Sequence, residues 1–424
     1  MLGLDFSFLC VALIIGSTFS ESSLEHVQVL FRHGDRTPAD AYPTDEYQEK
    51  DWPQGFGQLT QVGMKQHYQL GKFLQQKYVE DTELLDANYS RYEISIWSTD
   101  VDRTLMSAAV DLSGFFPPQG HQVWDKDIPW QPIPVHTMPV AEDFYLSFSA
   151  NCPTYTQLQE ESLNDDDYVA LSKKYAGFLK KLNTDSGFNG SITINNIYKV
   201  SDPLKIEKLK NLTLPDWTKE DKFWETLDFL STYAMGQMFD STAKSRLRGG
   251  PLLGQMINNM RDFMNTSQTG HKLKFHMYSA HDVTVTSLLT ALQIFNDLQP
   301  PYASAVGVEL WKNKDTKKSS PFSVRIWYRN NTQQVDPYNL ILPGCELDCP
   351  FDKFVELTKD RTLAEGDIRK ACGLVVTDNY WIPTIVGIAL GVMIVVFVVI
   401  YLITINRKLK AGHKLLEEVI EDPW

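Results

Sequence analysis

The chain has 424 residues, of which 43% are hydrophobic and 22% charged, and its formal net charge at pH 7 is −13. A chain of this length can bury a large core, and this composition is that of a folded protein rather than a disordered one. The acidic balance argues against nucleic acid as a partner, because binding to a phosphate backbone requires a basic footprint.

The chain begins with a short apolar stretch. Residues 6–16 have the length of the apolar core of a secretory signal peptide, and residues 18–20 could form a cleavage site. The preceding residues include Asp5 and no Lys or Arg, which is atypical of a signal. A buried helix is therefore the alternative, but we predict a signal peptide over residues 1–20.

The most informative segment follows an apolar, strand-like run at 26–30. Residues 31–38 spell FRHGDRTP and place His33 beside Arg32 and close to Arg36. Arginine binds phosphate through two parallel hydrogen bonds and stays charged at any pH that the protein meets. The pattern favours attack by His33 on a phosphoryl group that the arginines hold. A solvated basic loop with an incidental histidine is the alternative.

Further along, the helical spacing of apolar residues predicts a helix over 60–78. A short strand then ends at 98–99, where Asp100 or Asp102 could cap a helix that begins near Arg103. Strands and helices alternate over 24–150 and about 255–345, which is typical of a doubly wound sheet.

The strand signal fades between about 151 and 250, where helical stretches such as 223–238 dominate. The glycines and proline in 246–251 predict a hinge or turn that returns the chain to the α/β part. A third strand-like run then ends at residue 280, and His281, Asp282 and a helix follow. The three charged segments thus all lie just past the carboxyl end of a strand, where open α/β sheets bind ligands.

Near the C-terminus, residues 381–405 form an uncharged apolar run that exceeds the roughly 20 residues needed to span a bilayer. The basic segment 406–410 follows, as the positive-inside rule requires of a cytosolic flank. A buried core helix is the alternative. We predict a single-pass anchor at 381–405, a lumenal or extracellular catalytic body over 21–380, and a cytosolic tail over 406–424.

Glycosylation motifs and cysteines agree with this orientation. The acceptor motifs all precede the apolar run and begin at Asn88, Asn189, Asn211, Asn265 and Asn330. Cys10 lies in the predicted signal peptide, and the remaining cysteines are Cys152, Cys345, Cys349 and Cys372. Sequence alone allows three disulfide pairings in an oxidising compartment. A metal site is the competing interpretation, which the lack of a nearby histidine disfavours.

Taken together, the motifs RHGDRTP, STDVDRT and SAHD resemble those of the histidine acid phosphatases, in particular the lysosomal and prostatic group. Segments 52–60, 130–136 and 301–304 share this resemblance, which covers roughly residues 24–375. It implies an α/β fold with a doubly wound, mostly parallel sheet flanked by helices and a smaller, mainly helical domain inserted over about 151–250. A C-terminal transmembrane helix completes the predicted architecture.

The same resemblance implies two disulfides, Cys345–Cys349 and Cys152–Cys372. A third bridge that is usual in the family is missing, because Ile206 and Ala305 stand at its positions. The resemblance also implies a homodimer, since the segment with Trp130 and His136 matches the dimer interface of the family.

For the chemistry, we expect His33 to attack phosphorus and form a phosphohistidine that water later hydrolyses. Asp282 is the expected acid that protonates the leaving alcohol. The expected binders of the phosphoryl oxygens are Arg32, Arg36, Arg103 and His281. The positive charge of the three arginines should lower the pKa of His33 and offset the negative charge that develops in the transition state. We expect no metal and no cofactor, because the arginines already neutralise the phosphate.

We therefore predict an acid phosphatase that hydrolyses small phosphomonoesters. The alternatives are a phosphatase for a narrow substrate class, such as inositol phosphates or lysophosphatidate, and a catalytically silent ectodomain that serves as a receptor or adhesion module. The tail lacks tyrosine, and Ala411 stands where the sorting motif around Leu415 usually has an acidic residue. We accordingly predict a cell-surface pool beside any lysosomal one.

Overall fold

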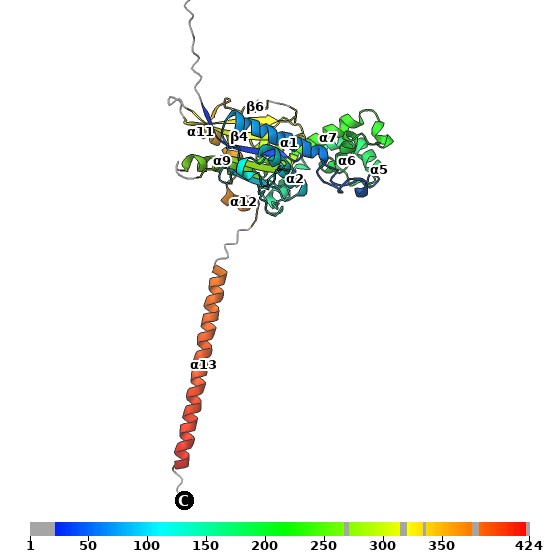
Figure 1. The fold of residues 1–424 in the computed structure, drawn as a ribbon. Coiled ribbons are helices and arrows are strands. Elements are labelled where there is room, and N and C mark those ends of the chain that lie inside the picture. Colours follow the sequence, from blue (N-terminus) through cyan, green and yellow to red (C-terminus); the bar gives the residue numbers. More distant parts are fainter. Residues whose placement is uncertain (1–21, 267–270, 314–319, 334–335, 375–380, 421–424) are drawn as a thin grey trace, which may run out of the picture. The chain divides into compact units, whose positions relative to one another are not determined.

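The computed structural model describes residues 22–266, 271–313, 320–333, 336–374 and 381–420. The chain divides into two compact units, one that ends at Gly373 and one that begins at Leu374 (Figure 1). The predicted signal peptide over 1–20 lies outside the described residues.

A seven-stranded sheet organises the first unit, in the order β2-β3-β1-β4-β5-β6 with β7 paired to β5. Its strands β2, β3 and β1 are parallel, whereas the pairs from β1–β4 onward are antiparallel. Parallel neighbours need a crossover connection, and antiparallel neighbours such as β4 and β5 can be joined directly. The strands are β1 (Ser23–Arg32), β2 (Ile94–Ser98), β3 (Phe275–Ala280), β4 (Ala305–Lys312), β5 (Phe322–Arg329), β6 (Tyr338–Leu340) and β7 (Cys349–Pro350).

Helices cover both faces of the sheet. The helices α1 (Gln61–Gln75) and α2 (Asp102–Phe115) bury Leu70 and Phe115 against one face, with Val29 of β1 among their contacts. On the other face, α9 (Gly250–Asn265) and α10 (Asp282–Ala291) pack in a cluster that includes Leu30. Successive residues of a strand point to opposite faces, so β1 contributes to both cores.

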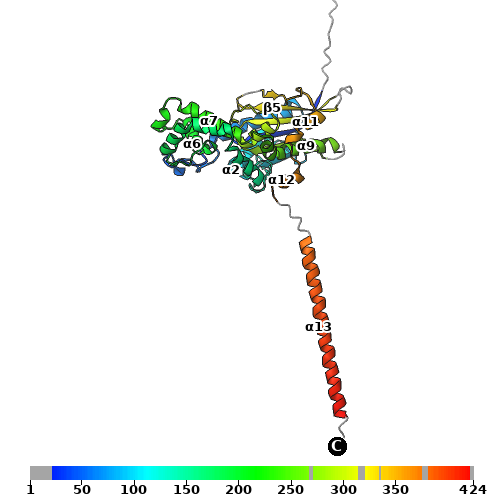
Figure 2. The same cartoon turned by 180° about the vertical axis from the view of Figure 1, so that it is seen from behind.

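The helical region lies between α2 and β3 in the chain. Its helices are α3 (Pro153–Ser162), α4 (Asp166–Lys174), α5 (Ala176–Asp185), α6 (Tyr198–Leu209), α7 (Phe223–Gln237) and α8 (Thr242–Arg248). Leu204 and Leu227 belong to a separate core cluster, which Tyr42 of the loop after β1 joins. Figures 1 and 2 show α6 and α7 at one end of the sheet rather than on its faces. The residue boundaries of this region as a domain stay a prediction, because all of it belongs to the first compact unit.

The remaining elements are short. The helices α11 (Phe351–Thr358) and α12 (Glu365–Ala371) follow the sheet. A π-helical turn, η2 (Gln76–Asp81), extends α1. The 3₁₀ turns are η1 (Glu49–Asp51), η3 (Gly120–Gln122), η4 (Ile194–Asn196), η5 (Asp216–Lys219) and η6 (Lys359–Arg361).

The predicted α/β fold with helices on both faces and a helical insertion is confirmed. The sheet is mixed: the predicted parallel pairing holds for β2, β3 and β1, and the other strand pairs are antiparallel. Two local predictions were wrong. The N-cap of α2 is the apolar Val101, so neither predicted aspartate occupies the capping position. The predicted hinge at 246–251 is a junction of α8 and α9 around Gly249. A Cβ at that glycine would lie 2.1 Å from the carbonyl oxygen of Ser287, so close packing rather than a turn requires glycine there.

Both disulfides that the resemblance implied are present. Cys152, just before α3, is bonded to Cys372 at the end of α12, and Cys345 is bonded to Cys349. The first bond therefore ties the beginning of the helical region to the last helix of the compact unit.

The second unit contains α13 (Trp381–Ile420). Its segment Ile385–Gly412 is long and apolar enough to cross a membrane, with a mean hydropathy of 3.1 and exposed side chains. The helix continues past the predicted end of the span at residue 405 and into the basic flank that contains Arg407. The apolar helix is confirmed, and its orientation across a membrane stays a prediction.

Candidate active site

The parallel half of the sheet brings the three charged segments to one edge. The backbone N–H of His33 donates to the carbonyl oxygen of Ala280 at 2.9 Å, and that of Thr99 donates to Ser279 at 3.1 Å. The hydrogen bonding of β1, β2 and β3 thus continues past the strand ends. The segments beginning at 31, 98 and 280 consequently lie side by side, as the sequence pattern predicts.

His33 is buried at the centre of this edge. Its ring centroid lies 5.6 Å from that of His281, and its Nδ1 atom lies 2.8 Å from the carbonyl oxygen of Gly34. A carbonyl can only accept, so we assign the proton to Nδ1, which leaves the Nε2 lone pair free. Burial, together with the charges of Arg32 and Arg36, holds the pKa of His33 well below 6.5. The imidazole is therefore neutral and nucleophilic.

Gly34 fixes the position of this histidine against α1. A Cβ on Gly34 would lie 2.5 Å from the carbonyl oxygen of Gly63, closer than side-chain carbons pack. The loop and the first turn of α1 consequently touch backbone to backbone. Thr60, the N-cap of that helix, accepts a hydrogen bond from the Gly63 N–H and reinforces the contact.

Three guanidinium groups surround the imidazole. Arg32 donates to the carbonyl oxygen of Pro300 at 2.7 Å, and its Nη2 lies 3.1 Å from a carboxylate oxygen of Asp282. Within the described chain, the Nε atoms of Arg32, Arg36 and Arg103 are buried and have no hydrogen-bond partner. Buried donors without a partner are costly, so the arrangement suits a ligand that is rich in acceptor oxygens.

Arg36 has a partner that sequence reasoning missed. Its Nη1 and Nη2 donate to the two carboxylate oxygens of Asp202 on α6, at 3.0 and 2.9 Å. Although burial works in the opposite direction, Asp202 raises the pKa of Arg36 above its usual range. The pKa of Arg103 is lowered to about 10 by burial and by neighbouring Arg36. Both groups remain cations at acid and neutral pH.

Asp282 and His281 complete the set. Asp282 begins α10, and one of its oxygens accepts from Gln299 Nε2 at 2.8 Å as well as facing Arg32. Burial would raise the pKa of Asp282, but the charge of Arg32 outweighs it and lowers the pKa to about 2. Burial and the charge of Arg103 lower the pKa of His281 to about 3. The resting site thus holds an ionised carboxylate and two neutral imidazoles.

The segment 130–136, which carries the predicted dimer contact, lies along the edge of β2 that is not paired with β3. His136 exchanges backbone hydrogen bonds with Ile96 and Ser98 at 3.0 and 2.9 Å. Trp130 is 44% exposed and Trp124 is 57% exposed, and the Trp124 indole N–H donates to the carbonyl oxygen of Trp130. The structure thus places large apolar surface here, while the dimer itself stays a prediction.

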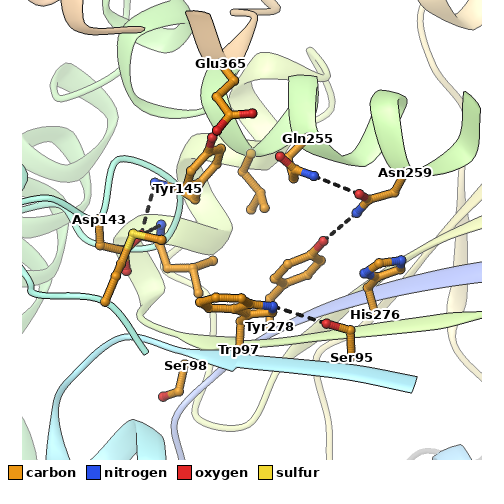
Figure 3. Close-up of a pocket in the computed structure, with 13 residues that line it drawn as sticks. Ser95, Trp97, Ser98, Asp143, Tyr145, Gln255, Asn259, His276, Tyr278 and Glu365 are labelled. Atoms are coloured by element: carbon orange, nitrogen blue, oxygen red, sulfur yellow. Dashed lines mark hydrogen bonds between the residues drawn. The ribbon is translucent and has the colours of Figure 1, made fainter. Parts of the chain in front are cut away.

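A separate cavity of about 330 Å³ lies between β2, β3 and α9 (Figure 3). Figure 3 shows Trp97 and Tyr278 in its lining, with a chain of hydrogen bonds from Gln255 through Asn259 to the Tyr278 hydroxyl. Among the described residues that line it there is no arginine or lysine, and burial lowers the pKa of His276 to about 4. The cavity therefore lacks the positive charge that a phosphoryl group needs.

Known proteins are similar to this chain in sequence over most of its length. Human prostatic acid phosphatase is 42% identical over 360 residues, which cover 84% of this chain and 90% of the relative. Lysosomal acid phosphatase of Xenopus laevis is 38% identical over 427 residues, which cover 97% and 95%. The phytase structure from Citrobacter braakii matches with a TM-score of 0.59 at 16% identity and covers 84% of this chain and all of that one, which shows a shared fold.

The family model of the histidine phosphatase superfamily (branch 2) matches residues 23–329. The matched stretch begins with β1 and ends with β5, so it includes every strand whose end carries a predicted site residue. Together with the relatives above, this match shows that the chain belongs to branch 2 of the histidine phosphatase superfamily.

Proposed function

We propose that this chain is an acid phosphatase that hydrolyses phosphomonoesters through a phosphohistidine at His33. The observation that carries the proposal is the neutral, buried imidazole with Arg32, Arg36 and Arg103 around it, each with an Nε donor that has no partner among the described residues. A tetrahedral oxyanion supplies acceptors for all of these donors. The names of the relatives, prostatic and lysosomal acid phosphatase, support the same activity.

In the first step, Nε2 of His33 attacks phosphorus and the bond from phosphorus to the ester oxygen breaks. Asp282 donates a proton to the leaving alkoxide, so an alcohol departs. The arginines hold the phosphoryl oxygens and offset charge that develops in the transition state. In the second step water attacks the phosphohistidine, inorganic phosphate leaves, and the Nε2 lone pair is restored.

The protonation state of Asp282 accounts for the acid preference. In the resting site Arg32 keeps this carboxylate ionised, with a pKa of about 2. A bound phosphoryl group brings negative charge to the arginines and raises the pKa of Asp282, and an acidic medium supplies the proton. His281 donates to a phosphoryl oxygen in this account, and its link to Thr99 Oγ1 at 3.0 Å orients the ring.

The proposal extends to the location of the protein. α13 anchors the chain in a membrane, the compact unit lies in the lysosomal lumen or outside the cell, and a fraction resides at the cell surface. The compact unit forms a homodimer through the segment with Trp130 and His136. Surface biotinylation of the full chain, beside a version that ends at Lys410, tests the location. Complete lysosomal residence that depends on residues 411–424 would contradict the surface pool.

The activity itself is tested with the full chain in detergent micelles. The substrates are an aryl phosphate, an alkyl phosphate, an inositol phosphate and lysophosphatidate, each measured from pH 4 to pH 8 beside His33→Ala. We expect hydrolysis of several classes at acid pH and none by His33→Ala. Turnover of one class alone would favour a narrow-substrate phosphatase. Absence of turnover in the folded wild type would favour a silent ectodomain.

A further inference from the structure

The helix α6 and its C-terminal end contact the segment 35–39 after β1, although the two are far apart in sequence. Asp202 binds the Arg36 guanidinium and also accepts a hydrogen bond from the backbone N–H of Ala39 at 3.1 Å. At the C-terminal end of α6, Lys210 Nζ lies 2.8 Å from an oxygen of Asp35. The helical region is thus attached directly to the residues that follow His33.

The contact with Asp202 uses one particular edge of the Arg36 guanidinium. Nη1 and Nη2 form the end of the group, and both point at the carboxylate of Asp202. Nη1 also donates to the carbonyl oxygen of Thr37 at 3.0 Å, so both of its hydrogens are used. The Nε hydrogen and the second Nη2 hydrogen remain, and these two form the lateral edge of the guanidinium.

The lateral edge is itself a two-pronged donor of the kind that binds two oxygens of one phosphoryl group. Nε of Arg36 is buried and lacks a partner within the described chain. The side chain as a whole is only 10% exposed, so it cannot satisfy Nε by turning to bulk water. The group that binds one edge of the guanidinium therefore determines which edge is left to face the phosphoryl group.

We propose that Asp202 is a positioning residue of the phosphatase, which holds the end of the Arg36 guanidinium so that its lateral edge is presented to the phosphoryl group. The inference rests on the proposed function and adds to it a residue from the helical region. Asp202 does not touch the substrate in this account. Its effect on the reaction passes through Arg36.

The neighbouring carboxylates do not replace it. Asp35 is held by Lys210, and Asp282 is held by Arg32 and Gln299. Without Asp202 the guanidinium loses a bidentate ionic partner, and rotation of the side chain moves the lateral edge out of line. A misplacement of about 1 Å can cost roughly 100-fold in rate. We therefore expect Asp202→Asn to lower kcat/KM by about 10- to 100-fold.

The loss should have a recognisable pattern. Arg36 holds the phosphoryl group and not the leaving group, so aryl and alkyl phosphates should lose the same factor. The inhibition constant of inorganic phosphate should rise in parallel, because phosphate uses the same donors. A loss confined to alkyl phosphates would place the effect on proton donation and would contradict the proposal.

A double-mutant cycle with Arg36→Ala in the full chain is the decisive experiment. In the Arg36→Ala background, Asp202→Asn should change kcat/KM less than about threefold, since the guanidinium that it positions has gone and the oxygen of an asparagine can still accept from the Ala39 N–H. An equal loss in both backgrounds would overturn the inference, and so would no loss in the wild-type background. Wild-type turnover measured in the same series separates these outcomes from failure of the proposed function, which would abolish turnover in every member.

Two further variants separate positioning from detachment of α6. Lys210→Met breaks another contact of the same helix without touching Arg36, so any loss that it causes should persist in the Arg36→Ala background. Asp228→Asn removes an exposed ion pair with Lys205 and should leave activity unchanged. If Lys210→Met instead showed the same coupling to Arg36 as Asp202→Asn, attachment of the helix and not the guanidinium contact would be responsible.

Discussion

Two largely buried carboxyl groups of this molecule have opposite acid–base behaviour. At the catalytic edge of the sheet, the pKa of Asp282 is lowered to about 2, although burial alone would raise it. Where α6 meets the loop after β1, the pKa of Glu207 on that helix is raised to about 8 by burial and by the charge of Asp45. The difference lies in the neighbours. Arg32 faces Asp282, whereas a second carboxyl faces Glu207.

The comparison shows how the neighbours of a buried carboxyl group determine its protonation state in each of the two regions. The carboxyl groups of Glu207 and Asp45 form a side-chain hydrogen bond with each other, which two ionised carboxylates could not make, so one of the two keeps its proton. Tyr42, Glu46 and Tyr47 also act on this pair, and none of the three is a cation. Where cations surround a buried carboxyl it stays ionised, and where they are missing it binds a proton.

The largest effect is expected at Asp282. Asp282→Asn removes the proton donor but keeps the shape, so alkyl phosphates, which need a proton on the leaving oxygen, should slow by about 100- to 10,000-fold. Aryl phosphates, which have better leaving groups, should slow far less. Steady-state kinetics on one ester of each kind measures the difference, with Asp228→Asn as a surface control. Equal losses for the two esters would show that Asp282 is not the acid.

A smaller effect is expected from Glu207→Gln, on stability instead of chemistry. The unfolded chain releases the Glu207 proton near pH 4.5, and the folded chain keeps it to about pH 8. The unfolded state therefore gains stability from ionisation across this window, and the stabilisation of the fold is lost as pH rises from about 4.5 to 8.

Thermal unfolding of the full chain across this window is the measurement. Glu207→Gln cannot ionise, so it should lose less stability with rising pH than the wild type and melt at a higher temperature than the wild type near pH 8. Glu356→Gln, which removes an exposed carboxylate on α11, serves as the control. Parallel curves for Glu207→Gln and wild type would mean that Glu207 is already ionised in the fold.

The smallest effect concerns the partner, Asp45. If one proton serves both carboxyls, Asp45→Asn should also flatten the dependence of unfolding on pH, and the double variant should gain little more than either single one. Additive gains in the double variant would show that the two carboxyls titrate independently, and would remove the contrast with Asp282.

The sequence predicted which segments meet at this edge of the sheet, and the reason is physical. Short apolar strands and their terminal motifs are local patterns, and parallel strands place their carboxyl ends together, so His33, Arg103 and Asp282 could be expected to meet. The contact of Arg36 with Asp202 joins residues 166 positions apart and leaves no local pattern. The same holds for the pair of Asp45 and Glu207, which meets only when the helical region has packed.

The disulfides show the same difference between local sequence patterns and contacts that are distant in sequence. Sequence alone left three pairings open, and only the resemblance to a known family indicated the two that the structure contains. At Gly249 a local pattern was interpreted wrongly. Its local pattern indicated a turn, but the residue is needed because α8 and α9 meet against the backbone of Ser287. Packing demands of this kind are not encoded in neighbouring residues.

The most direct test of the central claim is to trap the phosphoryl group on the enzyme. Full-length protein is mixed with phosphate-labelled ester, denatured within milliseconds and digested, and Asp282→Asn is treated alongside the wild type. The account predicts label on the peptide that contains His33, lost in acid and kept in alkali as a phosphohistidine requires, and none in His33→Ala. Label on a serine, aspartate or cysteine, or turnover by His33→Ala, would contradict it.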